Sequence, residues 1–207
     1  MDCLALVGCY LLGAIPFGLI IGKITRGIDI RDFGSGNIGA TNVLRTLGLG
    51  PALAVGFFDT VKGTAAVVLC SLLKMEPWMV VTGGVLSIAG HSFSVFLKFR
   101  GGKGVATSLG MIIGLNPMIA GIAFGLWLLI VAVGRIISVA SILAAISVPA
   151  MMFFWEKHVE YQTIAVIAAL LIVVKHRSNM KRLFAGTEAR IGQRVKMDNE
   201  GDTKGEK

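Results

Sequence analysis

Long apolar stretches constrain the fold of this chain more than any other feature of its sequence. Six of them are long enough to cross a lipid bilayer: residues 3–22, 51–73, 77–97, 117–133, 136–154 and 159–175. A membrane-spanning helix needs about 20 mostly apolar residues, with about 17 to 25 as the usual range. Since 55% of the 207 residues are hydrophobic, the sequence predicts an all-α polytopic membrane protein.

The five prolines support these boundaries. Pro51, Pro77 and Pro117 each open an apolar stretch, where the missing backbone N–H costs nothing. Pro16 and Pro149 lie inside such stretches and predict kinks.

A shorter apolar stretch at 104–115 is assigned as a seventh crossing because of the charge distribution. With seven helices, an outside N-terminus and a cytoplasmic C-terminus, 17 of the 20 Lys and Arg residues fall on one side. Basic residues concentrate on the cytoplasmic side of membrane proteins, so that side is assigned to the cytoplasm. The sequence therefore predicts seven transmembrane helices with a site formed by glycine-rich cytoplasmic loops.

The domain organisation is simple. Residues 1–196 are interpreted as one integral membrane domain, whose first span is retained because Asp2 rather than a basic cluster precedes it. Residues 197–207 are charged and poor in apolar side chains, which predicts a disordered cytoplasmic tail.

The charge excess indicates what kind of partner the chain binds. The formal net charge of +8 is clustered between apolar stretches, which favours membrane lipid headgroups or small anionic substrates over nucleic acid. The three cysteines show no metal-ligand spacing, and no cluster of His, Cys and carboxylate residues predicts a metal. We therefore expect neither a metal nor a cofactor.

Three polar clusters fall on the predicted cytoplasmic side: GSGNIGATNVLR at 34–45, GHSFSVFLKFRGGKGVATS at 90–108 and KHRSNMKRLFAGTE at 175–188. Glycines allow backbone N–H groups to converge on an anion, and Lys and Arg add charge and hydrogen bonds that phosphate oxygens favour. The first two clusters therefore resemble phosphate-binding loops, although RGGKG does not fit the nucleotide P-loop pattern. Each loop alone is also explained as a turn on the basic side of a membrane protein.

Side-chain spacing adds two further candidates. His176 and Asn179 share one helical face of the third cluster, while Arg177 and Lys181 share another. Asp59 and Lys62 are charged residues within a span, spaced i, i+3, and either form a structural ion pair or hold a site residue in place.

The three clusters resemble the bacterial acyl-phosphate-dependent glycerol-3-phosphate acyltransferase family over nearly the whole chain. The resemblance implies a cytoplasmic-membrane enzyme that transfers the acyl group of a long-chain acyl phosphate to the 1-hydroxyl of sn-glycerol 3-phosphate. The products are then lysophosphatidate and inorganic phosphate, in the first committed step of bacterial phospholipid synthesis. We expect the enzyme to act as a monomer.

Site residues are transferred from this resemblance. It implies that Ser35, Arg45, Lys103, His176 and Asn179 bind glycerol 3-phosphate, with Lys103, His176 and Asn179 as the catalytic residues. It implies that Asn37, Thr41, Gly102 and Ser141 bind the acyl phosphate. Ser138 and Ser141 are also explained as helix-packing hydroxyls, and the base that takes the hydroxyl proton is either His176 or a substrate phosphate oxygen.

Two other classes of function remain open at this point. A transporter or flippase for a phosphorylated metabolite also needs anion-binding residues and charges within helices. It should place polar groups along a path across the membrane, whereas this sequence gathers them on one side. A membrane scaffold that binds anionic lipid needs the basic residues but not Asn37, Thr41, His176 or Asn179.

Overall fold

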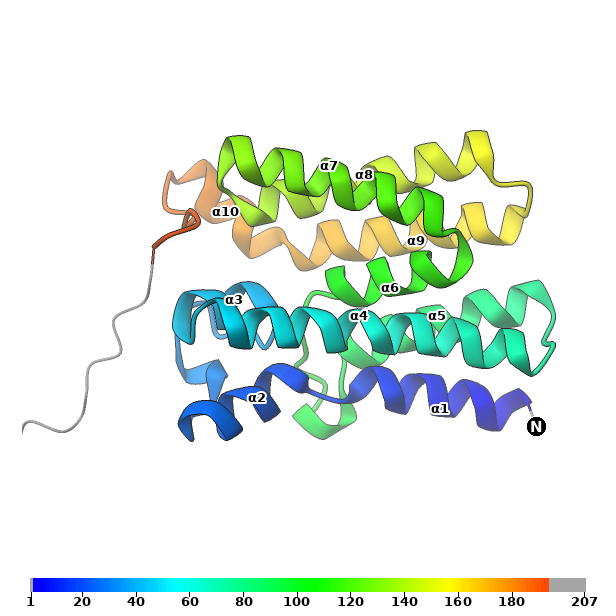
Figure 1. Ribbon diagram of the computed structural model, residues 1–207, viewed down its shortest axis with the longest axis horizontal. Coiled ribbons are helices and arrows are strands. Elements are labelled where there is room, and N and C mark those ends of the chain that lie inside the picture. Colours follow the sequence, from blue (N-terminus) through cyan, green and yellow to red (C-terminus); the bar gives the residue numbers. More distant parts are fainter. Residues whose placement is uncertain (1, 194–207) are drawn as a thin grey trace, which may run out of the picture.

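The computed structural model describes residues 2–193, and every regular element within them is helical (Figure 1). The predicted tail at 197–207 and the last residues of the predicted domain lie outside this range. The helices are α1 (Asp2–Ala14), α2 (Phe17–Arg26), η1 (Ile30–Asp32), α3 (Ala40–Thr46), α4 (Leu49–Leu72), α5 (Pro77–Ser92), η2 (Val95–Leu97), α6 (Val105–Leu115), α7 (Pro117–Gly134), α8 (Ile137–Trp155), α9 (Val159–Lys175) and α10 (Arg177–Phe184).

Proline sets several helix boundaries, as the sequence predicted. Helices α5 and α7 begin at Pro77 and Pro117, and the Asn116 side chain caps α7 by accepting a hydrogen bond from Ile119 N at 3.1 Å. Pro16 separates α1 from α2. Pro149, in contrast, lies inside α8 without ending it.

The described residues contain five stretches long and apolar enough to cross a membrane: Asp2–Arg26, α4, Pro77–Leu97, α7 and α8. Helices α9 and α10 make a sixth if they count as one span bent by 51°. Helix α6 has 11 residues, about 16 Å of helix against a bilayer core of about 30 Å. The chain is therefore an integral membrane protein, while the count of seven spans and their orientation stay predictions.

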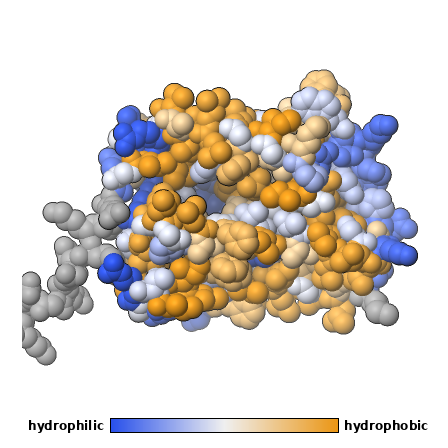
Figure 2. Space-filling model, in the orientation of Figure 1, coloured by the Kyte–Doolittle hydropathy of each residue, from blue (hydrophilic) through white to orange (hydrophobic). Residues whose placement is uncertain are grey.

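The helices form two groups that run along the long axis of the molecule (Figure 1). Helices α7, α8 and α9 make up one group and α1, α4 and α5 the other, with α6 between them. The short helices α2, α3 and α10 gather at one end. Hydrophobic side chains cover much of the visible surface between the two ends (Figure 2), as expected for contact with lipid.

Two glycines allow α4 and α6 to approach each other closely. A Cβ at Gly63 of α4 would overlap the carbonyl oxygen of Thr107, and a Cβ at Gly110 of α6 would overlap that of Thr60. Thr64 strengthens this contact by donating a hydrogen bond to Gly110 O at 2.8 Å. The contact of Gly63 with Thr107 lies at the start of α6 and thereby places the RGGKG segment that precedes it.

Candidate active site

A cavity of about 1200 Å³ lies between α4 and α6 on one side and α7, α8 and α9 on the other. It is visible as a hollow in the hydrophobic face of the molecule (Figure 2). On α8 its wall runs from Ile137 to Val148, and along α9 and the residue directly after it from Ala165 to His176, about 16 Å in each case. One end is lined by polar side chains of the loops, and the other by apolar side chains, several of which are alanines of α8 and α9.

Eight of the nine site residues expected from the sequence line this one cavity, although they come from distant parts of the chain: Ser35, Asn37, Thr41, Arg45, Lys103, Ser141, His176 and Asn179. In α10 and the residue that precedes it, the burial pattern confirms the predicted helical faces. His176 and Asn179 are buried, whereas Arg177 and Lys181 are exposed.

Gly102 is the exception, since it packs behind the cavity wall. Its N–H donates to His91 O at 3.0 Å, and the N–H of Gly101 donates to Ser92 O at 3.2 Å. A Cβ at Gly102 would overlap the His91 ring at Nε2. These two amides are therefore not free to bind a phosphate, and the glycine at 102 is required by its contact with His91.

The 34–45 segment is an ordered turn that leads into a short helix, where the sequence predicted only a loop. Asn42 on α3 is 1% exposed and holds the turn together. Its Nδ2 donates to the carbonyl oxygens of Ile30, Phe33 and Asn37, and its Oδ1 accepts from Ser35 N at 2.8 Å. The buried amide thus fixes the backbone that presents Ser35 and Asn37 to the cavity.

Glu188 connects the third cluster to the rest of the site, a role that sequence reasoning missed. Its carboxylate accepts hydrogen bonds from Asn179 Nδ2 at 2.7 Å, Ser138 Oγ at 2.9 Å and Arg182 Nε at 2.7 Å. Arg45 Nη2 lies 3.7 Å away. The only signal in the sequence was a carboxylate that follows a run of basic residues.

The pKa values at the polar end follow from burial and from these contacts. Burial alone would raise the pKa of Glu188, but hydrogen bonds from Asn179, Arg182 and Ser138 outweigh it and lower the pKa. Burial also lowers the pKa of Lys103 to about 8, with further lowering by Arg182 and Arg45. Lys103 therefore ionises near physiological pH, while Glu188 stays a carboxylate.

His176 lies directly after α9 and is neutral at physiological pH. Burial, followed by the charge of Lys103, lowers its pKa to about 4. Its Nδ1 is 2.8 Å from the carbonyl oxygen of Ile172, which only accepts, so Nδ1 carries the ring proton. The Nε2 lone pair is then free to accept a hydrogen bond or a proton.

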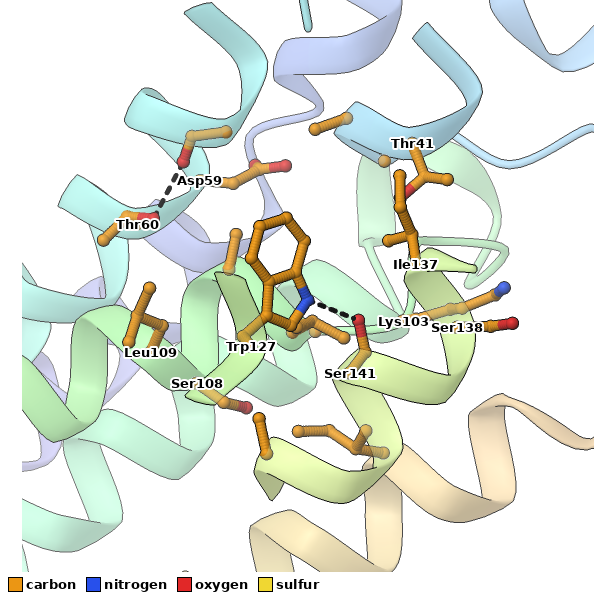
Figure 3. Close-up of a pocket in the computed structure, with 18 of the residues that line it drawn as sticks. Thr41, Asp59, Thr60, Lys103, Ser108, Leu109, Trp127, Ile137, Ser138 and Ser141 are labelled. Atoms are coloured by element: carbon orange, nitrogen blue, oxygen red, sulfur yellow. Dashed lines mark hydrogen bonds between the residues drawn. The ribbon is translucent and has the colours of Figure 1, made fainter. Parts of the chain in front are cut away.

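Hydrogen bonds connect the remaining polar groups across the cavity. Lys103 Nζ donates to Asn179 Oδ1, which joins the RGGKG segment to α10. Trp127 of α7 and Ser141 of α8 face each other (Figure 3), with the indole Nε1 donating to the Ser141 hydroxyl at 3.1 Å. Within residues 2–193, no group of three or more His, Cys, Asp and Glu side chains is arranged to hold a metal ion.

Comparison with known proteins yields a consistent match. The family model described as glycerol-3-phosphate acyltransferase matches residues 3–186. The glycerol-3-phosphate acyltransferase of Synechococcus sp. (strain JA-3-3Ab) is 47% identical over 191 residues, which cover 92% of this chain and 94% of the relative. That of Desulforamulus reducens is 44% identical, over 91% of this chain and 94% of the relative.

Solved structures agree with this match. The crystal structure of PlsY (YgiH), an integral membrane glycerol 3-phosphate acyltransferase, in its glycerol 3-phosphate form has a TM-score of 0.87 and 39% identity, over 92% of this chain and 96% of that chain. The lysophosphatidic acid form of PlsY has a TM-score of 0.85 and 38% identity, over 93% and 96% of the two chains. Together with the family match, these similarities show that the chain is an integral membrane enzyme of the glycerol-3-phosphate acyltransferase family.

Proposed function

We propose that this enzyme transfers the acyl group of a long-chain acyl phosphate to the 1-hydroxyl of sn-glycerol 3-phosphate. One observation carries the proposal: a single cavity has an excess of positive charge at one end and an apolar lining at the other. Such a cavity fits two phosphate groups and a fatty acyl chain together. The products are lysophosphatidate and inorganic phosphate.

The charge excess is built from side chains that share one carboxylate. Arg45 and Arg182 both form ion pairs with Glu188, and Lys103 also lies within its electrostatic influence. Three cations around one carboxylate leave this cluster positive, which favours an anionic ligand. The PlsY forms with glycerol 3-phosphate and with lysophosphatidic acid support this class of ligand by similarity.

The assignment of substrates to the wall follows the division expected from the sequence. Ser35, Arg45, Lys103, His176 and Asn179 bind glycerol 3-phosphate in this proposal. Asn37, Thr41 and Ser141 bind the acyl phosphate. Gly102 contributes to the binding of the acyl phosphate through its contact with His91. We also propose that the enzyme is a monomer in the bacterial cytoplasmic membrane, with the polar end of the cavity facing the cytoplasm.

An acyl phosphate is a mixed anhydride, so the protein mainly has to position two anions and stabilise the developing oxyanion. The 1-hydroxyl oxygen forms a bond to the acyl carbon, and the bond from that carbon to the phosphate oxygen breaks. The cations offset the repulsion between the two phosphates. The hydroxyl proton goes either to Nε2 of His176 or to a substrate phosphate oxygen.

Lys103 makes glycerol phosphate binding sensitive to pH. Because a bound dianion stabilises the ammonium, binding raises the pKa of Lys103 above its free value of about 8. Below that pH the lysine is already charged and the KM for sn-glycerol 3-phosphate should be constant. Above it, the KM should rise by up to about tenfold per pH unit.

Steady-state kinetics from pH 6.5 to 9.5 measure this dependence. The change from a constant to a rising KM near pH 8 is called the alkaline break. The variant Lys103→Arg keeps its charge throughout this range, so its KM should show no such break. A break that persists unchanged in Lys103→Arg would show that another group is responsible.

The direct test of the proposed function is release of inorganic phosphate by the detergent-solubilised protein from palmitoyl phosphate, with no added metal. Release should require sn-glycerol 3-phosphate and should accompany formation of lysophosphatidate. If the folded protein releases no phosphate but moves a phosphorylated metabolite across proteoliposome membranes, the transporter alternative would replace this proposal.

A further inference from the structure

A buried charged cluster lies behind the RGGKG segment, and two of its three members, Asp59 and His91, also line the cavity wall. It consists of Asp59 and Lys62 on α4 and His91 on α5, whose side chains are 3%, 1% and 4% exposed. Lys62 Nζ is 2.7 Å from Asp59 Oδ1 and 2.8 Å from His91 Nδ1. The ion pair expected from the i, i+3 spacing therefore exists, and it has a third member.

Three acceptor atoms surround the Lys62 ammonium. An ammonium carries three N–H groups, and Lys62 also donates to Ile15 O at 3.1 Å. This carbonyl lies in the break between α1 and α2, directly before Pro16. Since an unpaired buried charge is strongly destabilising in an apolar interior, these neighbours make the ammonium tolerable there.

The cluster also fixes His91. A lysine ammonium only donates, so Nδ1 of His91 accepts its hydrogen bond and the ring proton lies on Nε2. That nitrogen faces Gly102, where a Cβ would overlap it. The orientation of the His91 ring is therefore set from one side by Lys62 and from the other by Gly101 and Gly102, which we call the glycine loop.

The glycine loop is bound to the same helix end through its backbone. His91 O and Ser92 O accept from the amides of Gly102 and Gly101, and Ser92 O also accepts from Lys175 Nζ at 3.0 Å. The next residue, Lys103, reaches Asn179 across the cavity. A short chain of contacts thus connects the buried ion pair to the site.

We infer that Asp59, Lys62 and His91 are positioning residues, which hold the 101–103 segment so that the Lys103 ammonium is fixed at the polar end of the cavity. Lys103 reaches Asn179 from the 101–103 backbone, so a shift of that backbone moves the ammonium relative to Asn179 or breaks the contact. A displacement of about 1 Å caused by a distant change costs about 100-fold in rate. The inference rests on the proposed role of Lys103 in binding glycerol phosphate.

A purely structural ion pair is the competing explanation, and the double variant Asp59→Asn with Lys62→Met separates the two. It removes both charges together, retains similar side-chain volumes and leaves no lone buried charge. Its thermal unfolding and its elution in detergent establish that it is folded before any kinetic comparison.

We expect the folded double variant to lose about 10- to 100-fold in kcat/KM for sn-glycerol 3-phosphate. The alkaline break in KM should also move above pH 8, because a displaced Lys103 gains solvent and approaches the ordinary lysine pKa of about 10.4. The charged and titratable groups that act on Lys103 are Arg45 from α3, Arg182 from α10, and Glu188 and His176. None of these is altered, so a purely structural role would not move the break.

Thr64→Val is the matched control, because it removes an interhelical hydrogen bond from the same helix, two residues from Lys62. It should keep both the wild-type kcat/KM and the wild-type break. Wild-type kinetics in the folded double variant would overturn the inference, even if its unfolding temperature were lower. If the double variant does not fold, His91→Phe, which leaves the ion pair in place, decides by the same two measurements.

These outcomes are distinct from failure of the proposed function. A wild-type protein that shows no acyl transfer would reject the proposed function. A wild-type protein with an alkaline break that the folded variants share would reject only the positioning role.

Discussion

Replacing Lys103 with methionine is expected to lower kcat/KM for acyl transfer by about 100- to 1000-fold, the usual cost of removing one donor that stabilises developing negative charge. Methionine keeps most of the side-chain volume but removes the ammonium that reaches Asn179 at the polar end of the cavity. Phosphate release from palmitoyl phosphate at saturating and at low sn-glycerol 3-phosphate gives kcat and KM separately.

Lys98→Met is the matched control for this variant. Lys98 lies five residues earlier in the same connection between α5 and α6, but its side chain is exposed. The control should retain wild-type kinetics. Equal losses in both variants would mean that net positive charge near the membrane surface, rather than the Lys103 ammonium itself, drives the reaction.

Replacing Ala144 with leucine is expected to impair long-chain donors selectively. Ala144 lines the cavity on α8, one turn further from the polar end than Ser141. A leucine there occupies space that the proposed acyl chain needs. Since one methylene in a hydrophobic pocket is worth about 10- to 200-fold in selectivity, the preference for palmitoyl phosphate over butyryl phosphate should fall by about tenfold or more.

Ala150→Leu provides the comparison on the same helix, since Ala150 is exposed and does not line the cavity. Its ratio of kcat/KM for the two donors should match the wild-type ratio. A preference that is unchanged in Ala144→Leu would mean that the acyl chain lies elsewhere, for example against the outer surface of α8.

The sequence was sufficient for those parts of the fold that local chemistry determines. Proline and hydropathy placed the starts of α5 and α7 at Pro77 and Pro117, as the structure confirms. The short helix α6 is different, because hydropathy and charge counts do not show how a segment of 11 residues lies between two longer helix groups. The number of crossings therefore could not be obtained with the same certainty as the boundaries.

The site was predictable where a residue type has few other uses in a membrane protein. Asn179 and His176 stood out for that reason, and both line the cavity. The contacts of Gly102 and Glu188 could not be predicted, because they join segments that are distant in the sequence. Gly102 is small because the His91 ring packs on it, and Glu188 matters because Arg45 lies beside it although it is 143 positions away in sequence.

The opening of the cavity on the hydrophobic face (Figure 2) has a kinetic consequence. A donor that enters from the lipid is sampled at its mole fraction in the bilayer or micelle, not at its concentration in the bulk solution. Adding detergent at constant total donor should therefore reduce the rate by surface dilution, while the saturation curve for the water-soluble acceptor keeps its midpoint. Rates measured in different detergents become comparable only when the donor concentration is expressed as a mole fraction of the lipid and detergent present.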